Sequence, residues 1–216
     1  MRLVRVPALA AALLATAAAA APERALRFDE AFAEAPVSLH YQAEYQARGA
    51  SHQLEAWVDR GLRLKRVTDG QVESYAVRAS AHEPEYRMTV LDLRRRISTR
   101  IDRSNLFRIG SFTDWFELAH ALRHPRGDYQ LARVSAPAGA GKPLAACDWY
   151  QLTQEGRASK VCWSQAAALP LSIVSDEGQE VWRVTQLQRG PVRASVFEVH
   201  DRDFVRNDAN GDIEKD

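Results

Sequence analysis

The chain has 216 residues, with 29 lysines and arginines against 28 aspartates and glutamates, so its formal net charge is +1. This balance argues against a dedicated nucleic-acid binder, which would carry a clustered basic surface. The length suits one large domain, or a β-rich domain with an appendage.

Residues 1–20 have the order of a secretory signal peptide. Arg2 and Arg5 give a basic start, an apolar run follows, and alanines lead to an expected cleavage site after Ala20. The alternative is a membrane anchor, but the run is short and mostly alanine, whereas a spanning helix needs about 20 strongly apolar residues. No cysteine follows the run, so lipid attachment is not expected. We therefore predict a soluble, exported protein of the periplasm, with no transmembrane segment after cleavage.

The mature chain is expected to start with a short helix over 22–35, which ends before Pro36. From residue 38 the pattern changes to the alternation of a half-buried strand, with Leu39, Tyr41 and Tyr45 on one side of "SLHYQAEYQA". Further runs of the same kind predict strands at 52–59, 62–67, 71–77, 86–93, 95–101 and 106–110.

A second helix is predicted in "SFTDWFELAHALRHP", residues 111–125. Ser111 with Asp114 resembles a capping box, and Pro125 stops the helix. One stripe holds the apolar side chains Phe112, Trp115, Phe116, Ala119 and Leu122. A helix with adjacent aromatic residues needs an apolar surface, and the concave face of a curved sheet would provide one.

Both cysteines lie in "CDWYQLTQEGRASKVCW", residues 147–163, which reads as two strands around a glycine turn. If Thr153 faces Gly156 or a near neighbour, Cys147 lies opposite Cys162, within the range of a disulfide. In an exported protein such a pair is expected to be oxidised. A redox or metal-binding pair is the alternative, but the C-x-x-C spacing is missing.

Three more strands are predicted at 169–175, 180–187 and 192–199, separated by the turns "DEG" and "QRG". The fold class is therefore mainly β (α+β), a curved antiparallel meander of about ten strands covered by one or two helices. We expect a single domain over 21–206 and a polar tail over 207–216.

Residues with catalytic or metal-binding chemistry are few. Glu117, His120 and His124 share one face of the predicted helix, and the two histidines have a zinc-like spacing, although solvent-facing polar residues are the simpler interpretation. The tail "NDANGDIEKD" alternates acidic residues as calcium loops do, but it lacks glycine at the sixth position. No G-x-S-x-G nucleophile motif is present. We therefore expect no enzyme, no cofactor and no bound metal.

The segments "HQLEAWVDRGLRLKRVTDGQVESYAV" and "ALPLSIVSDEGQEVWRVTQLQRGPVRASVFEV" are similar to the hairpins and closing strands of a known family. Together with the signal peptide and the order of elements, they make the chain resemble the periplasmic lipoprotein-carrier-like half-barrel superfamily, which includes LolA, LolB and the N-terminal domain of RseB. The resemblance implies a half-barrel sheet around a hydrophobic cavity that accepts lipid acyl chains, with helices as a lid.

A half-barrel cannot close its own interior, so helix or ligand must cover its apolar face. The residues expected to line that face are Leu39, Tyr41, Tyr45, Leu54, Val58, Met88, Val90, Trp115, Phe116 and Leu122. The alternative is an ordinary core in which these side chains fill the space among themselves.

The leading hypothesis is thus a periplasmic binding protein for a lipid or other apolar ligand, with a lipoprotein or an envelope protein as a further partner. The second is an envelope-stress sensor or regulatory module that binds a protein through its sheet edge. The third, weaker one is a metal-dependent enzyme that uses Glu117, His120 and His124.

Overall fold

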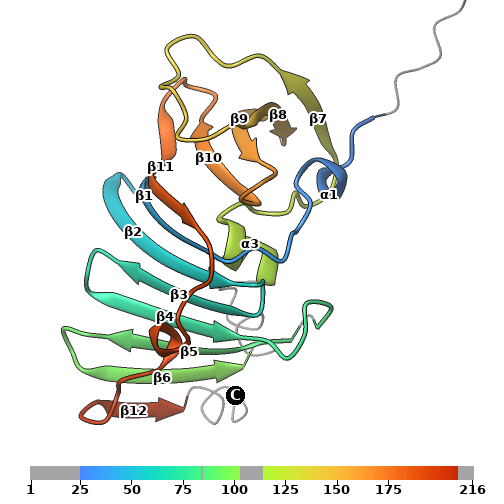
Figure 1. The fold of residues 1–216 in the computed structure, drawn as a ribbon. Helices are drawn as coiled ribbons and strands as arrows, with labels where there is room; N and C mark the ends of the chain where they lie inside the picture. Colours follow the sequence, from blue (N-terminus) through green and yellow to red (C-terminus); the bar gives the residue numbers. More distant parts are fainter. Residues whose placement is uncertain (1–24, 84, 103–113, 209–216) are drawn as a thin grey trace, which may run out of the picture.

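The structure is a computed structural model that describes residues 25–83, 85–102 and 114–208 (Figure 1). Its strands are β1 (Leu39–Ala47), β2 (Ala50–Asp59), β3 (Arg63–Thr68), β4 (Val72–Val77), β5 (Arg87–Asp92), β6 (Ile97–Asp102), β7 (Tyr129–Val134), β8 (Asp148–Gln154), β9 (Arg157–Ser164), β10 (Leu169–Val174), β11 (Glu180–Arg189) and β12 (Val205–Asp208). Its helices are α1 (Phe28–Ala31), α3 (Trp115–His120) and the 3-10 helix η1 (Ala194–Phe197). The expectation of a mainly β protein is confirmed.

All twelve strands belong to one sheet, in the order β12-β6-β5-β4-β3-β2-β1-β11-β10-β9-β8-β7. The sheet consists of two antiparallel meanders, β1–β6 and β7–β11, which are joined where β1 pairs with β11. β12 adds to β6 as a parallel strand. The sheet is open, with β12 and β7 at its edges, and the prediction of one continuous meander is wrong because β1 pairs with β11. The half-barrel form stays a prediction.

Turn chemistry sets the register of the hairpins. Arg48–Gly49, Asp69–Gly70 and Glu155–Gly156 each have positive φ at both residues, between 51° and 78°. Two such residues in succession form the tight hairpin turn whose twist matches that of the flanking strands, and glycine at the second position avoids the steric cost. The turn after β1 therefore pairs Ala47 with Ala50 and, further along, Tyr41 with Ala56.

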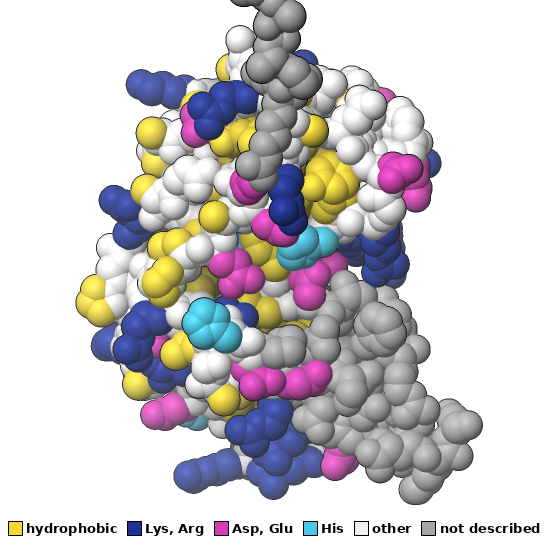
Figure 2. All heavy atoms as spheres, turned by 90° about the vertical axis from the view of Figure 1, so that its right-hand side faces the viewer, with side chains coloured by type: hydrophobic (Ala, Val, Ile, Leu, Met, Phe, Trp, Pro, Cys, Tyr) yellow, Lys and Arg dark blue, Asp and Glu magenta, His cyan; other side chains and the backbone are white. Residues whose placement is uncertain are grey.

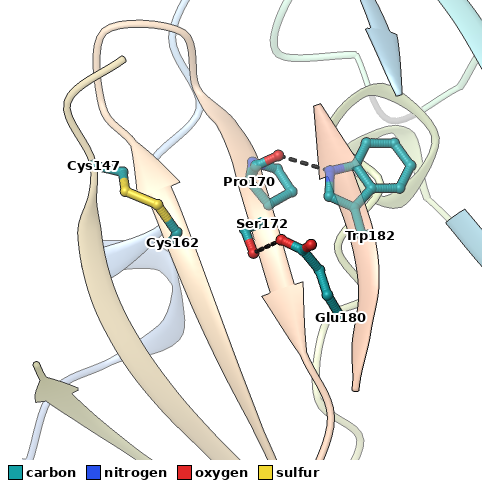
Figure 3. Close-up of a disulfide and its surroundings, with 6 residues drawn as sticks. All are labelled: Cys147, Cys162, Pro170, Ser172, Glu180 and Trp182. Carbon is teal, nitrogen blue, oxygen red and sulfur yellow. Dashed lines mark hydrogen bonds between the residues drawn. A yellow bond between two sulfur atoms is a disulfide. The ribbon is translucent and has the colours of Figure 1, made fainter. Parts of the chain in front are cut away.

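The disulfide predicted between Cys147 and Cys162 is confirmed, with a Cα–Cα distance of 5.4 Å (Figure 3). The register predicted for this hairpin is wrong by two residues. Gln154 pairs with Arg157 around the turn, so Trp149 is the residue opposite Cys162, and Cys147 precedes the first residue of β8. The bond therefore fixes the chain just before β8 to the interior of β9.

Two apolar clusters hold the fold together. The first includes buried residues of both meanders and of α3, among them Tyr41, Leu64, Leu118 and Trp182. The second lies under α1 and includes Phe28, Phe32, Phe116, Tyr150 and Trp163. β8 and β9 are buried on both faces, because Trp149 and Cys162 belong to the first cluster whereas Tyr150 and Val161 belong to the second.

Several predicted boundaries differ from the structure. The first helix is much shorter than 22–35, and α3 begins after Asp114, which caps it by accepting a hydrogen bond from the Glu117 backbone N–H. The segment 192–199 is not a strand but contains η1. β7 and β12 were not predicted, and β12 includes the first two residues of the expected tail. The signal peptide (1–20), the strand at 106–110, Ser111 and Phe112 lie outside the described residues.

Within the described ranges, no helix has both the length and the apolar character needed to cross a membrane.

Candidate functional site

The ten residues predicted to line a ligand cavity are mostly core residues. Leu39, Tyr41, Leu54, Val58, Met88 and Trp115 belong to the first cluster and are at most 3% exposed. Tyr45 and Val90 are partly buried against that cluster. Phe116 and Leu122 belong to the second cluster, so the structure divides the predicted set between two places.

The space between the sheet and α3 is filled by these side chains. Leu118 and Ala119 of α3 are at most 2% exposed, and the Arg66 guanidinium donates to the Leu118 carbonyl at 3.4 Å. Trp115 lies between the Tyr86 ring, at 5.6 Å, and the Arg78 guanidinium, at 4.5 Å. We call this side of the sheet the α3 face.

On the α3 face, the Tyr41 hydroxyl and the Trp115 indole nitrogen are buried without a hydrogen-bond partner among the described residues. Burial raises the pKa of Tyr41, and the nearby Arg66 charge opposes that rise. Buried polar atoms normally have a hydrogen-bond partner, so the desolvation of these two atoms lowers the stability of the fold.

The opposite side of the sheet carries a cavity. Leu64, Ala76, Met88 and Ile101 pair with one another across β3–β6 and belong to the first cluster, so they point toward the α3 face. Side chains alternate along each strand, so their sequence neighbours point the other way. We call that side the η1 face, because η1 contacts β3 there.

The cavity on the η1 face has a volume of about 580 Å³, and we call it the η1 cavity. Its floor is the outer surface of β3–β6, and its other wall is formed by 194–199 and Asp208. Apolar side chains on its lining include Val77, which is 41% exposed, Val199, which is 36% exposed, and Phe197. The charged lining residues are Arg63, Arg87, Arg100, Glu198 and Asp208.

The wall exists because the chain leaves the sheet after β11. Gly190 has a φ of 144° and donates its N–H to the Ser38 carbonyl at 2.9 Å. Pro191 follows and has no N–H for a further ladder, so the chain cannot continue as a central strand. Figure 1 shows it running from β11 across the sheet to β12. The Phe197 ring packs against the Arg63 guanidinium at 4.8 Å.

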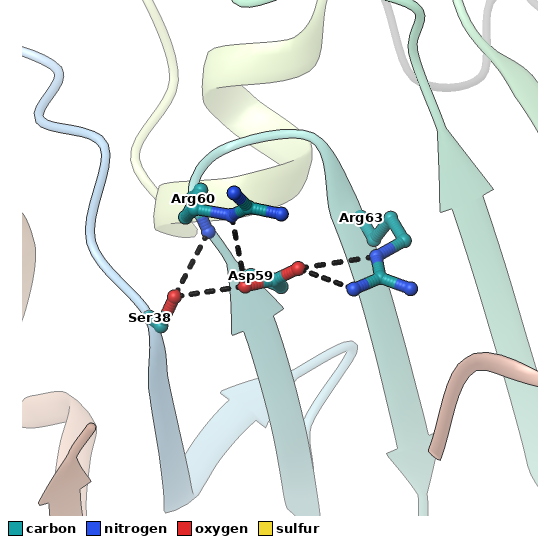
Figure 4. Close-up of polar contacts among 4 residues, drawn as sticks. All are labelled: Ser38, Asp59, Arg60 and Arg63. Carbon is teal, nitrogen blue, oxygen red and sulfur yellow. Dashed lines mark hydrogen bonds and ion pairs between the residues drawn. The ribbon is translucent and has the colours of Figure 1, made fainter. Parts of the chain in front are cut away.

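Asp59 holds Arg63 in place at the rim (Figure 4). Its carboxylate accepts from Arg63 Nε at 3.1 Å, from the Arg63 terminal nitrogen at 2.5 Å and from the Ser38 hydroxyl at 2.9 Å. Burial alone would raise the pKa of Asp59, but the hydrogen bonds from Arg63 and Ser38 outweigh it and lower the pKa. Arg63 is thus paired with Asp59, whose other oxygen lies 3.5 Å from Arg60 Nε.

An aromatic and charged row continues along the η1 face. Lys65 lies over the Trp57 and Tyr75 rings at 5.6 and 5.1 Å and pairs with Glu73 at 3.2 Å. The Tyr75 hydroxyl donates to the Glu73 carboxylate. Burial and then Glu73 raise the pKa of Tyr75, so the phenol stays protonated at neutral pH.

The three residues considered for a metal site have separate partners. Glu117 accepts from Arg123 at 2.8 Å, and the buried His120 is bonded to the Ala168 carbonyl at 2.5 Å. Burial lowers the pKa of His120, which keeps the ring neutral. His124 is bonded to Asp114 at 3.0 Å. Over 25–83, 85–102 and 114–208, no three histidine, cysteine or acidic residues come together as a metal site.

His124 connects the two helices. Its other nitrogen lies 3.5 Å from the Asp29 carboxylate of α1. The hydrogen bond to Asp114 is the largest cause of a raised pKa for His124, although its partial burial opposes that rise. Figure 2, seen from the side of α1, shows histidine, acidic and basic side chains interspersed with apolar surface.

Of the ten residues predicted to line a ligand cavity, only Met88 lines the η1 cavity. Arg63, Val77, Arg87 and Arg100 are ordinary outward-facing residues of their strands, and the wall at 194–199 has the alternation of a strand. The Gly190–Pro191 pair was the available signal, because it ends the ladder before that segment.

No protein-family model matches the chain, and a search of the curated proteins found no match. Among solved structures the chain is similar to MucB, with a TM-score of 0.42 and 17% identity, over 82% of this chain and 62% of that one. A structure of the Pseudomonas aeruginosa MucA/MucB complex gives 0.38 and 18%, over 76% and 56%. PNGF-II gives 0.34 and 8%, over 83% and 33%.

The chain thus matches less than two thirds of the length of each of these proteins. TM-scores below 0.5 at such identities do not carry a conclusion about this chain. The resemblance to the half-barrel superfamily stays a prediction.

Proposed function

We propose that the protein is a soluble periplasmic binding module without catalytic activity, which holds a lipid acyl chain or another apolar ligand. In this proposal the sheet has the form of a half-barrel, whose α3 face is filled by the protein's own core. The ligand occupies the η1 cavity, and no cofactor takes part.

The observation that carries the proposal is the contrast between the two faces. Six of the ten residues predicted to line the α3 face are at most 3% exposed, whereas the η1 cavity offers about 580 Å³ with Val77, Phe197 and Val199 accessible on its lining. Sites for small molecules have volumes of roughly 300–1,000 Å³. Each methylene that leaves water for such a site contributes about 0.8 kcal/mol, so apolar contact suffices for binding.

Val77→Asp tests the location, because it places a charge among the apolar side chains of the cavity. We expect its affinity for a fluorescent long-chain fatty ligand to fall at least about tenfold, because a carboxylate at position 77 lies directly opposite Arg63 and Arg87, pairs with them and repels an anionic head group. Val72→Asp is the matched control, because Val72 lies on the same strand, is 36% exposed and does not line the cavity. Equal affinities for Val77→Asp and the wild type would contradict the proposed location.

Native mass spectrometry of protein purified from the periplasm tests the function itself. We expect a lipid-sized mass on the wild type and a lower occupancy on Val77→Asp. Protein that carries no such mass and binds no added fatty ligand would exclude a lipid-binding function.

The open edges of the sheet favour one alternative, an envelope-stress sensor or regulatory module. β7 and β12 are edge strands, and all four residues of β12 are exposed. Edge strands can pair with an added strand of a partner protein. A polypeptide that copurifies in place of a lipid, and that is lost on mutation of an edge strand, would favour this alternative.

A further inference from the structure

Two arginines on the lining of the η1 cavity have no ion pair with a described residue. Arg87 lies on β5 and Arg100 on β6, both are exposed, and both line the cavity. The register pairs Arg87 with Asp102 and Thr89 with Arg100, so the two arginines are diagonal neighbours on one face of adjacent strands. Arg63, in contrast, is already bound to Asp59.

The other charges of the cavity limit what these arginines can hold. Glu198 and Asp208 also line it, and Asp208 is the register partner of Arg100. Besides Arg63, which is paired with Asp59, the lining thus has two guanidinium groups and two carboxylates, and the Asp201 carboxylate is close enough to Arg100 for that charge to help lower its pKa. An anionic ligand group that binds the arginines adds negative charge next to these carboxylates. A head group with one negative charge is therefore repelled less than a head group with two.

From this arrangement we infer that the ligand of the η1 cavity is a long-chain carboxylate, whose head binds Arg87 and Arg100. This inference rests on the proposed function and adds the chemistry of the head. Arginine matches a carboxylate with parallel N–H donors, which makes these bonds stronger than neutral ones. The tail would lie along Val77, Phe197 and Val199. A cavity of about 580 Å³ favours one chain over the several chains of a lipoprotein anchor.

The experiment compares three probes of equal chain length on the full protein, each below its micelle threshold. These are hexadecanoate, hexadecanol and monohexadecyl phosphate, measured by displacement of a fluorescent fatty ligand. We expect hexadecanoate to bind most tightly. Arg87→Gln and Arg100→Gln should each weaken its binding by about tenfold, because each removes hydrogen bonds from a charged donor. Hexadecanol should bind the wild type and both variants alike.

Arg94→Gln is the control, since Arg94 is exposed, carries the same charge and does not line the cavity. Its affinity for hexadecanoate should equal that of the wild type. Equal binding of the acid and the alcohol to the wild type would overturn the inference and leave the proposed function standing. Tighter binding of the phosphate would overturn the preference for a single charge. If none of the three probes binds, the proposed function itself fails.

Discussion

Asp59 lies at the end of β2 with its side chain only 7% exposed, between the start of β1 and the start of β3. Its hydrogen bonds connect Ser38 with Arg63, so one carboxylate fixes three neighbouring strands. A buried carboxylate is tolerated at this place because both of its oxygens have partners. Phe197 then packs on the arginine that this carboxylate holds.

Asp59→Asn should lower the free energy of unfolding at pH 7 by about 1–3 kcal/mol, because it weakens hydrogen bonds to a charged group. The folded-state pKa of Asp59 lies below the unfolded value of about 3.9, so its stabilisation is present above that pH and lost as pH falls through the folded pKa. The difference between wild type and variant in urea unfolding should therefore be full at pH 7 and shrink below about pH 4.

Asp128→Asn serves as the control for this prediction, since Asp128 is exposed and has no charged partner among the described residues. If the loss of unfolding free energy in Asp59→Asn were the same at all pH values, the charge of Asp59 would not be the cause of its stabilising effect.

At the scale of elements, the hairpin of β8 and β9 is closed by the disulfide. Reduction should lower the free energy of unfolding by about 3 kcal/mol in the chain-entropy model, because the bond spans 15 residues. Guanidinium unfolding with and without reductant measures the effect. The double variant Cys147→Ser, Cys162→Ser should not respond to reductant. Identical midpoints for the wild type under both conditions would refute the prediction.

The contact between α1 and α3 should depend on pH. The folded-state pKa of His124 is raised, so the stabilisation from its pairs with Asp114 and Asp29 is complete below the unfolded value of about 6.5 and is lost as pH rises through the folded pKa. His124→Gln should therefore be less stable than the wild type at pH 6 and nearly equal to it at pH 9. His82→Gln, at an exposed position, should follow the wild type at both values.

Strands could be predicted where alternation and turn residues agreed, as in Leu39–Ala47 followed by Arg48–Gly49. The segment 192–199 alternates apolar and polar residues as a strand does, but it does not join the sheet. Pro191 interrupts the backbone hydrogen bonds, and Phe197 packs on Arg63 instead. The first helix was predicted over 22–35, but within the described residues it covers only Phe28–Ala31, because the chain leaves the helical conformation at Phe32, where φ is −115° and ψ is 52°.

The site was harder to predict than the fold. The ten residues predicted to line a cavity are buried in, or packed against, the two apolar clusters, but sequence pattern cannot say whether an inward face is filled or hollow. Trp115 and Leu118 of α3 fill it. The cavity on the other face combines residues as far apart as Arg63 and Asp208, which no local pattern connects.

For the whole molecule, we expect the two meanders to unfold together. α3 contributes Leu118 to the first cluster and Phe116 to the second, and β1 pairs with β11 along most of its length. Far-ultraviolet circular dichroism and tryptophan fluorescence should therefore give coincident transitions in urea. Leu118→Ala should lower the free energy of unfolding by about 2–5 kcal/mol while keeping the transitions coincident. Separate transitions would show two independent folding units.

The pairing of β1 with β11 also has a consequence for biosynthesis. Leu39 and Arg189 are partners in the finished sheet, so the edge of β1 has nothing to pair with until almost the whole chain has emerged. An unpaired strand edge is a template for aggregation during that interval. The edge of β1 that later pairs with β11 is therefore a site of aggregation risk while the chain is being made.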